Sequence, residues 1–190
     1  MPEPDTKPKP ELYTRYPTKN IVIYNGTTIL HYLFGSFGLM LGYNFLWDGL
    51  GGFLFSFIYL IFAFMQMYII MPLTVCPNCV YYRLKDGLCT SGLNRFSRKI
   101  AKEGNLKDFA KRAGSPFCHN KLYMASLFIP ILAIIPTLII NFSVILLIVF
   151  LTVLGLLLFR FFVVFQKTAC VHCRAKNMCP NAKAMGLVDK

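Results

Sequence analysis

Four long apolar stretches dominate the pattern of hydrophobic and polar positions along the chain. They cover residues 28–47, 53–73, 122–140 and 142–165. A helix needs roughly 20 apolar residues to cross the hydrocarbon core of a bilayer. Because every backbone N–H and C=O group in lipid must be paired within the segment, such stretches are helical. The pattern therefore predicts four transmembrane helices.

Very short turns connect the first stretch to the second and the third to the fourth. Residues 48–52 read Asp-Gly-Leu-Gly-Gly, and Asn141 marks the other turn. We therefore expect two helical hairpins, at residues 21–73 and 122–165. The polar segments outside them are an arm, a central loop and a tail, at residues 1–20, 74–121 and 166–190. The predicted fold is an all-α integral membrane protein with these three segments on one side.

The basic residues indicate which side that is. Of the 20 Lys and Arg residues, four lie in the arm, ten in the central loop and five in the tail, and neither hairpin turn has any. Cytoplasmic segments next to membrane spans carry such an excess of Lys and Arg. This distribution predicts a protein of the cell (inner) membrane with both termini and all cysteines in the cytoplasm. The remaining basic residue, Arg160, is predicted to extend from the fourth helix to the same interface.

Composition agrees with a membrane protein. The chain is 56% hydrophobic, and its mean hydropathy is +0.54. Its formal net charge is +12, which we interpret as a topology signal and as attraction to anionic lipids of the bilayer. No nucleic-acid recognition motif accompanies the charge, so no nucleic-acid partner is predicted.

The polar segments differ in their predicted order. Five prolines among charged residues in the arm indicate an extended segment that is mobile unless a partner holds it. In the central loop, residues 91–104 and 105–114 have the pattern of two short basic amphipathic helices, with Asn105 as the cap of the second. Such helices either lie in the headgroup layer or cover the cysteines as a lid.

The cysteines are the strongest functional signal. All seven lie outside the apolar stretches; they are Cys76, Cys79, Cys89 and Cys118 in the central loop and Cys170, Cys173 and Cys179 in the tail. Because disulfides are uncommon in the cytoplasm, these thiols favour metal binding. Each CxxC pair begins where an apolar stretch ends, and two cysteines at this spacing can bind one centre. His119 follows Cys118, and His172 lies inside the second CxxC pair. Both histidines are further candidate ligands.

Two features favour iron–sulfur clusters of the 4Fe–4S type. Cys179-Pro180 ends its run as a ferredoxin cysteine run does. The C-x2-C-x5-C spacing of residues 170–179 also resembles the run in the auxiliary-cluster domains of radical enzymes. The alternative is zinc, with the two CxxC pairs joined in one tetrahedral site. In either case we expect the loop and tail cysteines to lie close together.

Motifs of common enzyme classes are missing. The chain has no phosphate-binding glycine loop, no nucleophile elbow and no HExxH. No βαβ pattern typical of thioredoxin surrounds the CPNC sequence. The sequence therefore predicts an electron-transfer subunit that links a soluble cytoplasmic partner to a membrane acceptor such as a quinone. His31, Tyr24 and Arg160 are predicted to line the quinone approach. The alternative is a zinc-stabilised, non-enzymatic scaffold or subunit of a membrane complex.

Overall fold

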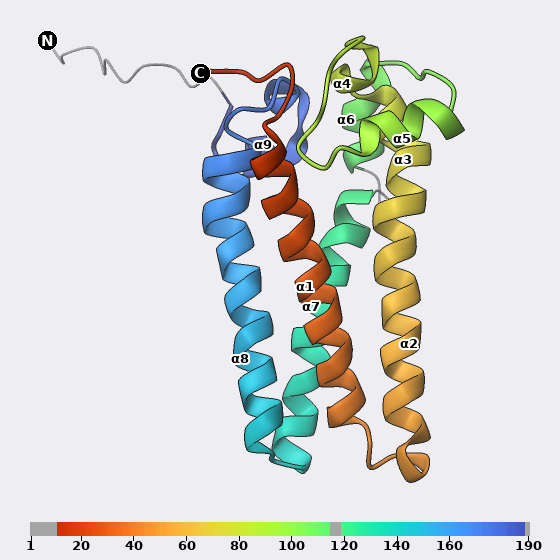
Figure 1. Cartoon of the computed structure of the whole chain (residues 1–190), viewed down its shortest axis with the longest axis vertical. Coiled ribbons are helices and arrows are strands. Elements are labelled where there is room, and N and C mark those ends of the chain that lie inside the picture. Colours follow the sequence, from red (N-terminus) through yellow and green to blue (C-terminus); the bar gives the residue numbers. More distant parts are fainter. Residues whose placement is uncertain (1–10, 115–118, 189–190) are drawn as a thin grey trace, which may run out of the picture.

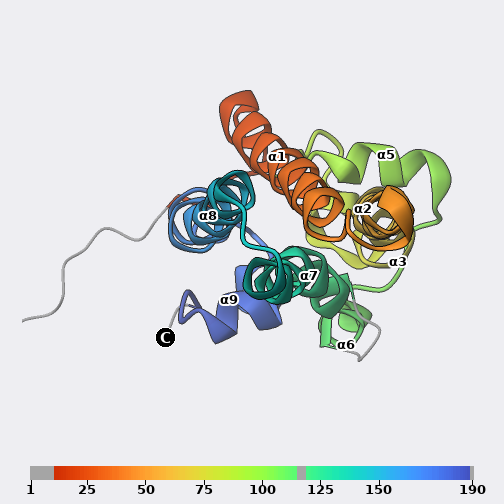
Figure 2. The same ribbon diagram turned by 90° about the horizontal axis from the view of Figure 1, so that it is seen from below.

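The computed structural model of the chain describes residues 11–114 and 119–188. All regular secondary structure in these residues is helical, as the sequence predicts. Four long helices lie side by side along the longest axis (Figure 1). They are α1 (Thr18–Gly42), α2 (Leu50–Met65), α7 (His119–Ile140) and α8 (Val144–Phe159). Viewed from below, α1 lies between α2 and α8 and also contacts α7 (Figure 2).

Three segments of the described chain are long and apolar enough to cross a membrane. They are Trp47–Asn78, Lys121–Ile140 and Val144–Ala169. The helix α1 has 25 residues but is not among them, because polar residues such as Asn25 and His31 interrupt its apolar pattern. The coarser prediction of an all-helical protein with membrane-spanning character is thus supported for three of the four predicted helices.

The helix α1 also begins earlier than predicted, at Thr18 and not at residue 28. Its polar side chains Thr28 and His31 are fully buried against the other helices, whereas Leu30 and Leu33 face outward. Burial of these polar groups explains why the helix continues through a segment that hydropathy alone does not mark.

Close packing positions α1 against α7. A Cβ atom added at Gly38 or Gly42 would lie 2.5 Å from a side-chain atom of Ile134 or Thr137, respectively. The GxxxG spacing therefore allows the two helices to approach closely, as expected for small residues at a helix interface.

Two of the long helices change to π-helical geometry before they end. After α2, the chain continues through the π-helical η2 (Gln66–Ile70) and then α3 (Met71–Thr74). After α8, it continues through the π-helical η4 (Arg160–Ala169). Interruptions of this kind are rare and frequently occur at functional sites. Here each precedes a CxxC pair.

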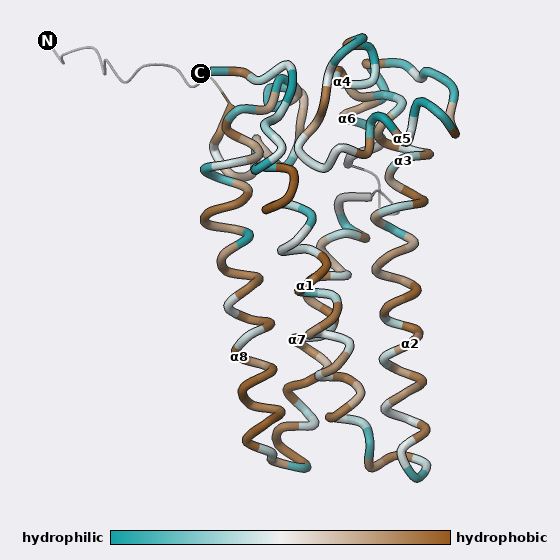
Figure 3. The backbone as a smooth tube through the Cα atoms, in the orientation of Figure 1, coloured by the Kyte–Doolittle hydropathy of each residue, from teal (hydrophilic) through white to brown (hydrophobic). Residues whose placement is uncertain are grey.

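Short helices gather at the end of the bundle where the central loop and the tail lie (Figure 1). Hydrophilic residues concentrate at this end, whereas the shafts of the long helices are mostly hydrophobic (Figure 3). In chain order the remaining elements are η1 (Trp47–Gly49), η3 (Cys76–Asn78), α4 (Val80–Arg83), α5 (Leu93–Ile100), α6 (Lys107–Gly114), η5 (Lys176–Met178) and α9 (Pro180–Ala184).

Both predicted basic helices of the central loop are present, as α5 and α6, and both are shorter than predicted. The side chain of Asn105 accepts the N–H of Lys107 at 3.1 Å and caps the second helix, as the sequence predicts.

Residues 11–17 of the arm pair with the polar segments at this end of the bundle. Its backbone pairs with both polar segments: the Tyr13 N–H donates to the His172 carbonyl at 3.0 Å, and the Tyr16 N–H donates to the Leu88 carbonyl at 2.9 Å. Tyr16 is only 2% exposed. Proline and charge content describes an isolated chain, whereas this segment lies between two surfaces that offer backbone partners. Residues 1–10 lie outside the described residues.

Candidate metal centre

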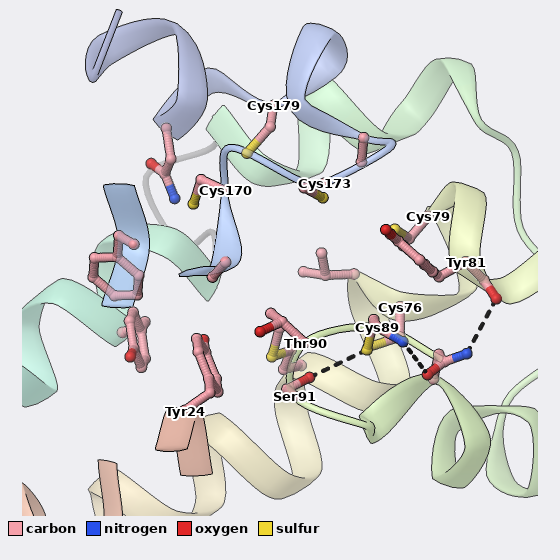
Figure 4. Close-up of a pocket in the computed structure, with 18 of the residues that line it drawn as sticks. Tyr24, Cys76, Cys79, Tyr81, Cys89, Thr90, Ser91, Cys170, Cys173 and Cys179 are labelled. Atoms are coloured by element: carbon pink, nitrogen blue, oxygen red, sulfur yellow. Dashed lines mark hydrogen bonds between the residues drawn. The ribbon is translucent and has the colours of Figure 1, made fainter. Parts of the chain in front are cut away.

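A cavity of about 190 Å³ lies between the central loop and the tail, directly above the ends of the long helices. Six cysteines line it: Cys76, Cys79, Cys89, Cys170, Cys173 and Cys179. Figure 4 shows the three tail cysteines on one side and the three loop cysteines facing them. The folded chain thus brings together thiols that are about 100 residues apart in sequence.

The two CxxC pairs form the same kind of turn. The N–H of Cys79 donates to the carbonyl of Cys76 at 3.0 Å, and the N–H of Cys173 donates to the carbonyl of Cys170 at 3.2 Å. In each pair the second sulfur also accepts a backbone N–H from two residues further on, Tyr81 or Ala175. Backbone N–H groups directed at sulfur stabilise thiolates and tune metal centres.

The third cysteine of the loop is held by neighbouring polar groups. Its backbone N–H donates to the Asn94 side chain at 3.1 Å, and the Cys89 sulfur lies 3.4 Å from the Ser91 hydroxyl oxygen. Asn94 is almost fully buried and also donates to the carbonyls of Tyr81 and Gly87. This amide therefore fixes the position of Cys89 at the cavity wall (Figure 4).

All six thiols are free, and none forms a disulfide with another described cysteine. Burial raises the pKa of Cys79 and of Cys170 to about 12, and the neighbouring Cys173 sulfur adds to the increase in both. Burial likewise raises the pKa of Cys173 to about 11. Without metal these thiols stay protonated at neutral pH, so metal binding must displace their protons.

The described side chains at the cavity are not arranged as a closed ligand set for one ion. Among the described residues, no three His, Cys, Asp or Glu side chains converge on one position as ligands of a single ion. A tetrahedral ion with Zn–S bonds of about 2.3 Å holds its ligands only about 3.8 Å apart. A four-iron cluster binds each cysteine at a different iron atom, so its ligands stand further apart.

The floor of the cavity is aromatic and lies over a buried cation. Tyr24, Tyr123 and Phe165 line the cavity from the bundle side, and Tyr24 extends from α1 toward the sulfurs (Figure 4). The Arg160 guanidinium carbon lies 5.0, 5.7 and 5.3 Å from the centroids of these three rings. Arg160 is fully buried, so the prediction that it extends to the membrane interface is wrong. Hydrogen-bond partners inside the bundle hold it there.

Two other predicted site residues, His31 and His172, do not line the cavity. His31 does not line the cavity; its Nε2–H donates to the Leu127 carbonyl at 3.0 Å. Because α1 begins at Thr18 and rises 1.5 Å per residue, His31 lies about 20 Å from the start of the helix. The His172 Nδ1–H donates to the Glu11 carbonyl at 2.8 Å, and the His172 ring stacks on Tyr13.

Two further candidates cannot be placed. Cys118 lies outside the described residues, and His119 is the first residue of α7 with a side chain that is likewise outside the described part.

Sequence reasoning missed Tyr81 and Tyr16, which join the polar segments. The Tyr81 hydroxyl donates to the Tyr13 carbonyl at 2.7 Å and accepts the Arg174 N–H at 3.2 Å. The Tyr16 hydroxyl donates to the Ala169 carbonyl. The available signal was the presence of aromatic residues with polar tips in segments otherwise rich in charge, because such residues often seek a buried partner.

Comparison with family models, with curated proteins and with solved structures finds no match to this chain. The function must therefore be inferred from the chemistry of the site.

Proposed function

We propose that this protein is an integral membrane electron-transfer subunit with an iron–sulfur centre of the 4Fe–4S type, bound at the cytoplasmic membrane surface. The single observation that carries the proposal is the cavity lined by six free cysteines from two distant segments. A bound cluster would supply one-electron transfer. The cysteines of the loop and tail would hold it, and the aromatic floor would keep water away from it.

The proposed topology has four crossings, with α1 as the fourth. Its outward-facing Val22, Leu30 and Leu33 are apolar and exposed, and its buried face carries the polar groups. A helix with this distribution suits lipid outside and a polar interior partner inside. The Lys and Arg excess in the arm, central loop and tail supports a cytoplasmic position for the cavity.

The proposed electron route runs from a soluble cytoplasmic protein to a membrane acceptor such as a quinone. The support is the lining of the cavity, which combines residues of the polar segments with residues of the long helices such as Tyr24 and Tyr123. Tyr24 remains a candidate for the acceptor side, because it reaches the cavity from the bundle.

The second candidate function is a zinc-stabilised scaffold. It is favoured by the way the cysteines join loop and tail, since a structural metal contributes folding energy to such a lobe. In this case the protein would be colourless and would contain zinc in a fixed ratio to the chain.

The metal content decides between the two functions. The full-length protein, purified anaerobically in detergent, should show broad visible absorption, bound iron and acid-labile sulfide. Replacement of Cys76 or Cys170 by Ser should remove these signals while the helices still insert. Stoichiometric zinc without colour would contradict the electron-transfer proposal. Absence of both metals from anaerobic protein, even after reconstitution, would contradict both proposals.

The topology has its own test. A tag inserted at residues 49–51 should be accessible only from outside the cell, and a tag in residues 91–113 only from the cytoplasm. Labelling of the central loop from outside would contradict the proposed orientation and the argument from a reducing compartment.

A further inference from the structure

The buried guanidinium of Arg160 has no negatively charged partner in the described part of the chain. It donates to the Tyr24 carbonyl at 2.9 Å, to the Thr27 hydroxyl at 2.7 Å and to the Tyr123 hydroxyl, all of which are neutral groups. Its Nε–H has no partner, and no described Asp or Glu forms an ion pair with it. Because arginine stays charged in protein interiors, this is a desolvated cation without a counter-ion.

One aromatic layer separates this cation from the cavity. The three rings that lie over the guanidinium are those of Tyr24, Tyr123 and Phe165, and each of them lines the cavity. The hydroxyls of Tyr24 and Tyr123 are hydrogen-bond partners, so a polar path leads from the guanidinium to the cavity. In surroundings of low polarity, the charge of the guanidinium acts strongly across one layer of side chains.

The cavity itself contains no formal charge that could balance a metal centre. None of its described lining residues is Lys, Arg, Asp or Glu. Cysteines bind metals as thiolates, and four thiolates around Zn²⁺ give a net charge of about −2. Four thiolates around an iron–sulfur core also give an anionic centre. A positive charge nearby would stabilise such a centre in a cavity without formal charges.

We propose that Arg160 is the fixed counter-charge of the metal centre. This inference rests on the proposed function and adds a role for a residue outside the ligand set. Without metal, the charge of Arg160 is uncompensated. With metal, Arg160 and the thiolates stabilise each other, and the more negative, reduced form of a redox centre benefits most. Arg160 thus acts without contacting the metal: it favours metal loading and raises the reduction potential of the centre.

The test uses the full-length protein and two substitutions, Arg160→Met and Arg160→Lys. Each variant is reconstituted anaerobically with ferrous iron and sulfide and, separately, with Zn²⁺. A unit charge that acts over about 10 Å at an effective dielectric constant of ~20 changes an equilibrium by roughly tenfold. We therefore expect Arg160→Met to release metal to a chelator roughly tenfold more readily. The reduction potential of its iron form should fall by about 59 mV, the one-electron equivalent of a tenfold change. Arg160→Lys should stay close to the unchanged protein.

Stability of the metal-free protein separates a counter-charge from a packing role. If Arg160 is an uncompensated charge, Arg160→Met should leave the metal-free melting temperature equal or higher, while it weakens metal retention. Gln66→Leu is the matched control, because Gln66 is also fully buried in the bundle with an unpaired oxygen but carries no charge. It should not alter metal release.

Two results would overturn the inference. One is equal metal release and equal potential in Arg160→Met and the unchanged protein. The other is a parallel loss in Arg160→Lys and Arg160→Met together with a lower metal-free melting temperature, which would indicate packing. If the unchanged protein loads neither iron nor zinc, the proposed function fails with it, and that outcome is distinguishable from the first two.

Discussion

The two CxxC turns have the same local geometry but are supported in different ways. Both follow a π-helical segment, both close with a hydrogen bond from the fourth residue to the first, and both present a backbone N–H to the second sulfur. We call residues 74–114 the loop half and residues 166–188 the tail half. The shared geometry indicates the same task for both turns, so the difference lies in what holds each turn in place.

The loop half is largely self-supporting. Asn94 bonds to three backbone groups of this half, and Arg98 donates to the carbonyls of Tyr81, Tyr82, Leu84 and Lys85. The Asn78 side chain adds bonds to the Thr74 carbonyl and the Asn105 N–H. Because these partners all lie within residues 74–114, this half has a network that does not depend on the tail.

The tail half depends on other segments. Backbone bonds close its own turns, and its side chains and backbone also bond to other segments, from Ala169 to Tyr16, from His172 to Glu11 and Tyr13, and from Arg174 to Tyr81. Residues 11–17 of the arm therefore act as a strap between the halves. We therefore expect the tail half to open more readily than the loop half.

The largest expected effect comes from Asn94→Ala, which removes the side chain that bonds to three backbone groups of the loop half. Loss of this buried amide leaves three backbone groups without their partner, and unsatisfied buried groups cost about 1–3 kcal/mol each. At about 3 kcal/mol in total, local opening should increase roughly 100-fold. We expect alkylation of Cys89 in the metal-free protein to accelerate by this factor, measured by mass spectrometry. Alkylation of Cys170 should change little.

The control for this substitution is Asn177→Ala, because Asn177 is exposed in the tail half. It should alter neither rate. Equal acceleration of Cys89 and Cys170 in Asn94→Ala would show that the two halves open as one unit, and the comparison would then be wrong.

Much of the fold can be predicted from the length of the apolar stretches and from the spacing of small residues. The apolar stretches near α2, α7 and α8 predict those helices closely, because each is long and hydrophobic enough to need no knowledge of its neighbours. The start of α1 is different: Thr28 and His31 are buried among other helices, and single-sequence hydropathy counts them as polar.

The candidate site could be predicted only in part. The spacing and position of the cysteines predict that loop and tail lie together, because both leave the bundle on the same side. The Arg160 environment could not be predicted, since it depends on which faces of α1, α7 and η4 meet. The strap at Tyr16 depends on backbone hydrogen bonds, which composition does not encode.

A smaller effect is expected from Tyr81→Phe, which removes the bond between the halves and keeps the ring. The Arg174 N–H and the Tyr13 carbonyl each lose a partner, but both bonds are only partly buried. Because water can replace the lost partner, the cost is about 1.4 kcal/mol in total. Alkylation of Cys173 should accelerate roughly tenfold, with little change at Cys89. The matched control is Tyr82→Phe, whose hydroxyl bonds to the Ala101 carbonyl inside the loop half. If Tyr82→Phe exposes Cys173 equally, the tail half does not depend on Tyr81.

The smallest effect is expected from the stack between Tyr13 and His172. Their ring centroids lie 4.4 Å apart with an interplanar angle of 15°, and an aromatic pair of this kind contributes about 1 kcal/mol. Tyr13→Ala should accelerate alkylation of Cys173 about fivefold. Because the His172 ring is already engaged by Tyr13 and Glu11, His172→Ala should have a similar effect, and the double substitution should add little. Metal content should stay unchanged in all three variants. Loss of metal in His172→Ala alone would instead identify His172 as a metal ligand. The metal, and not residues 11–17, would then be what holds the tail half in place.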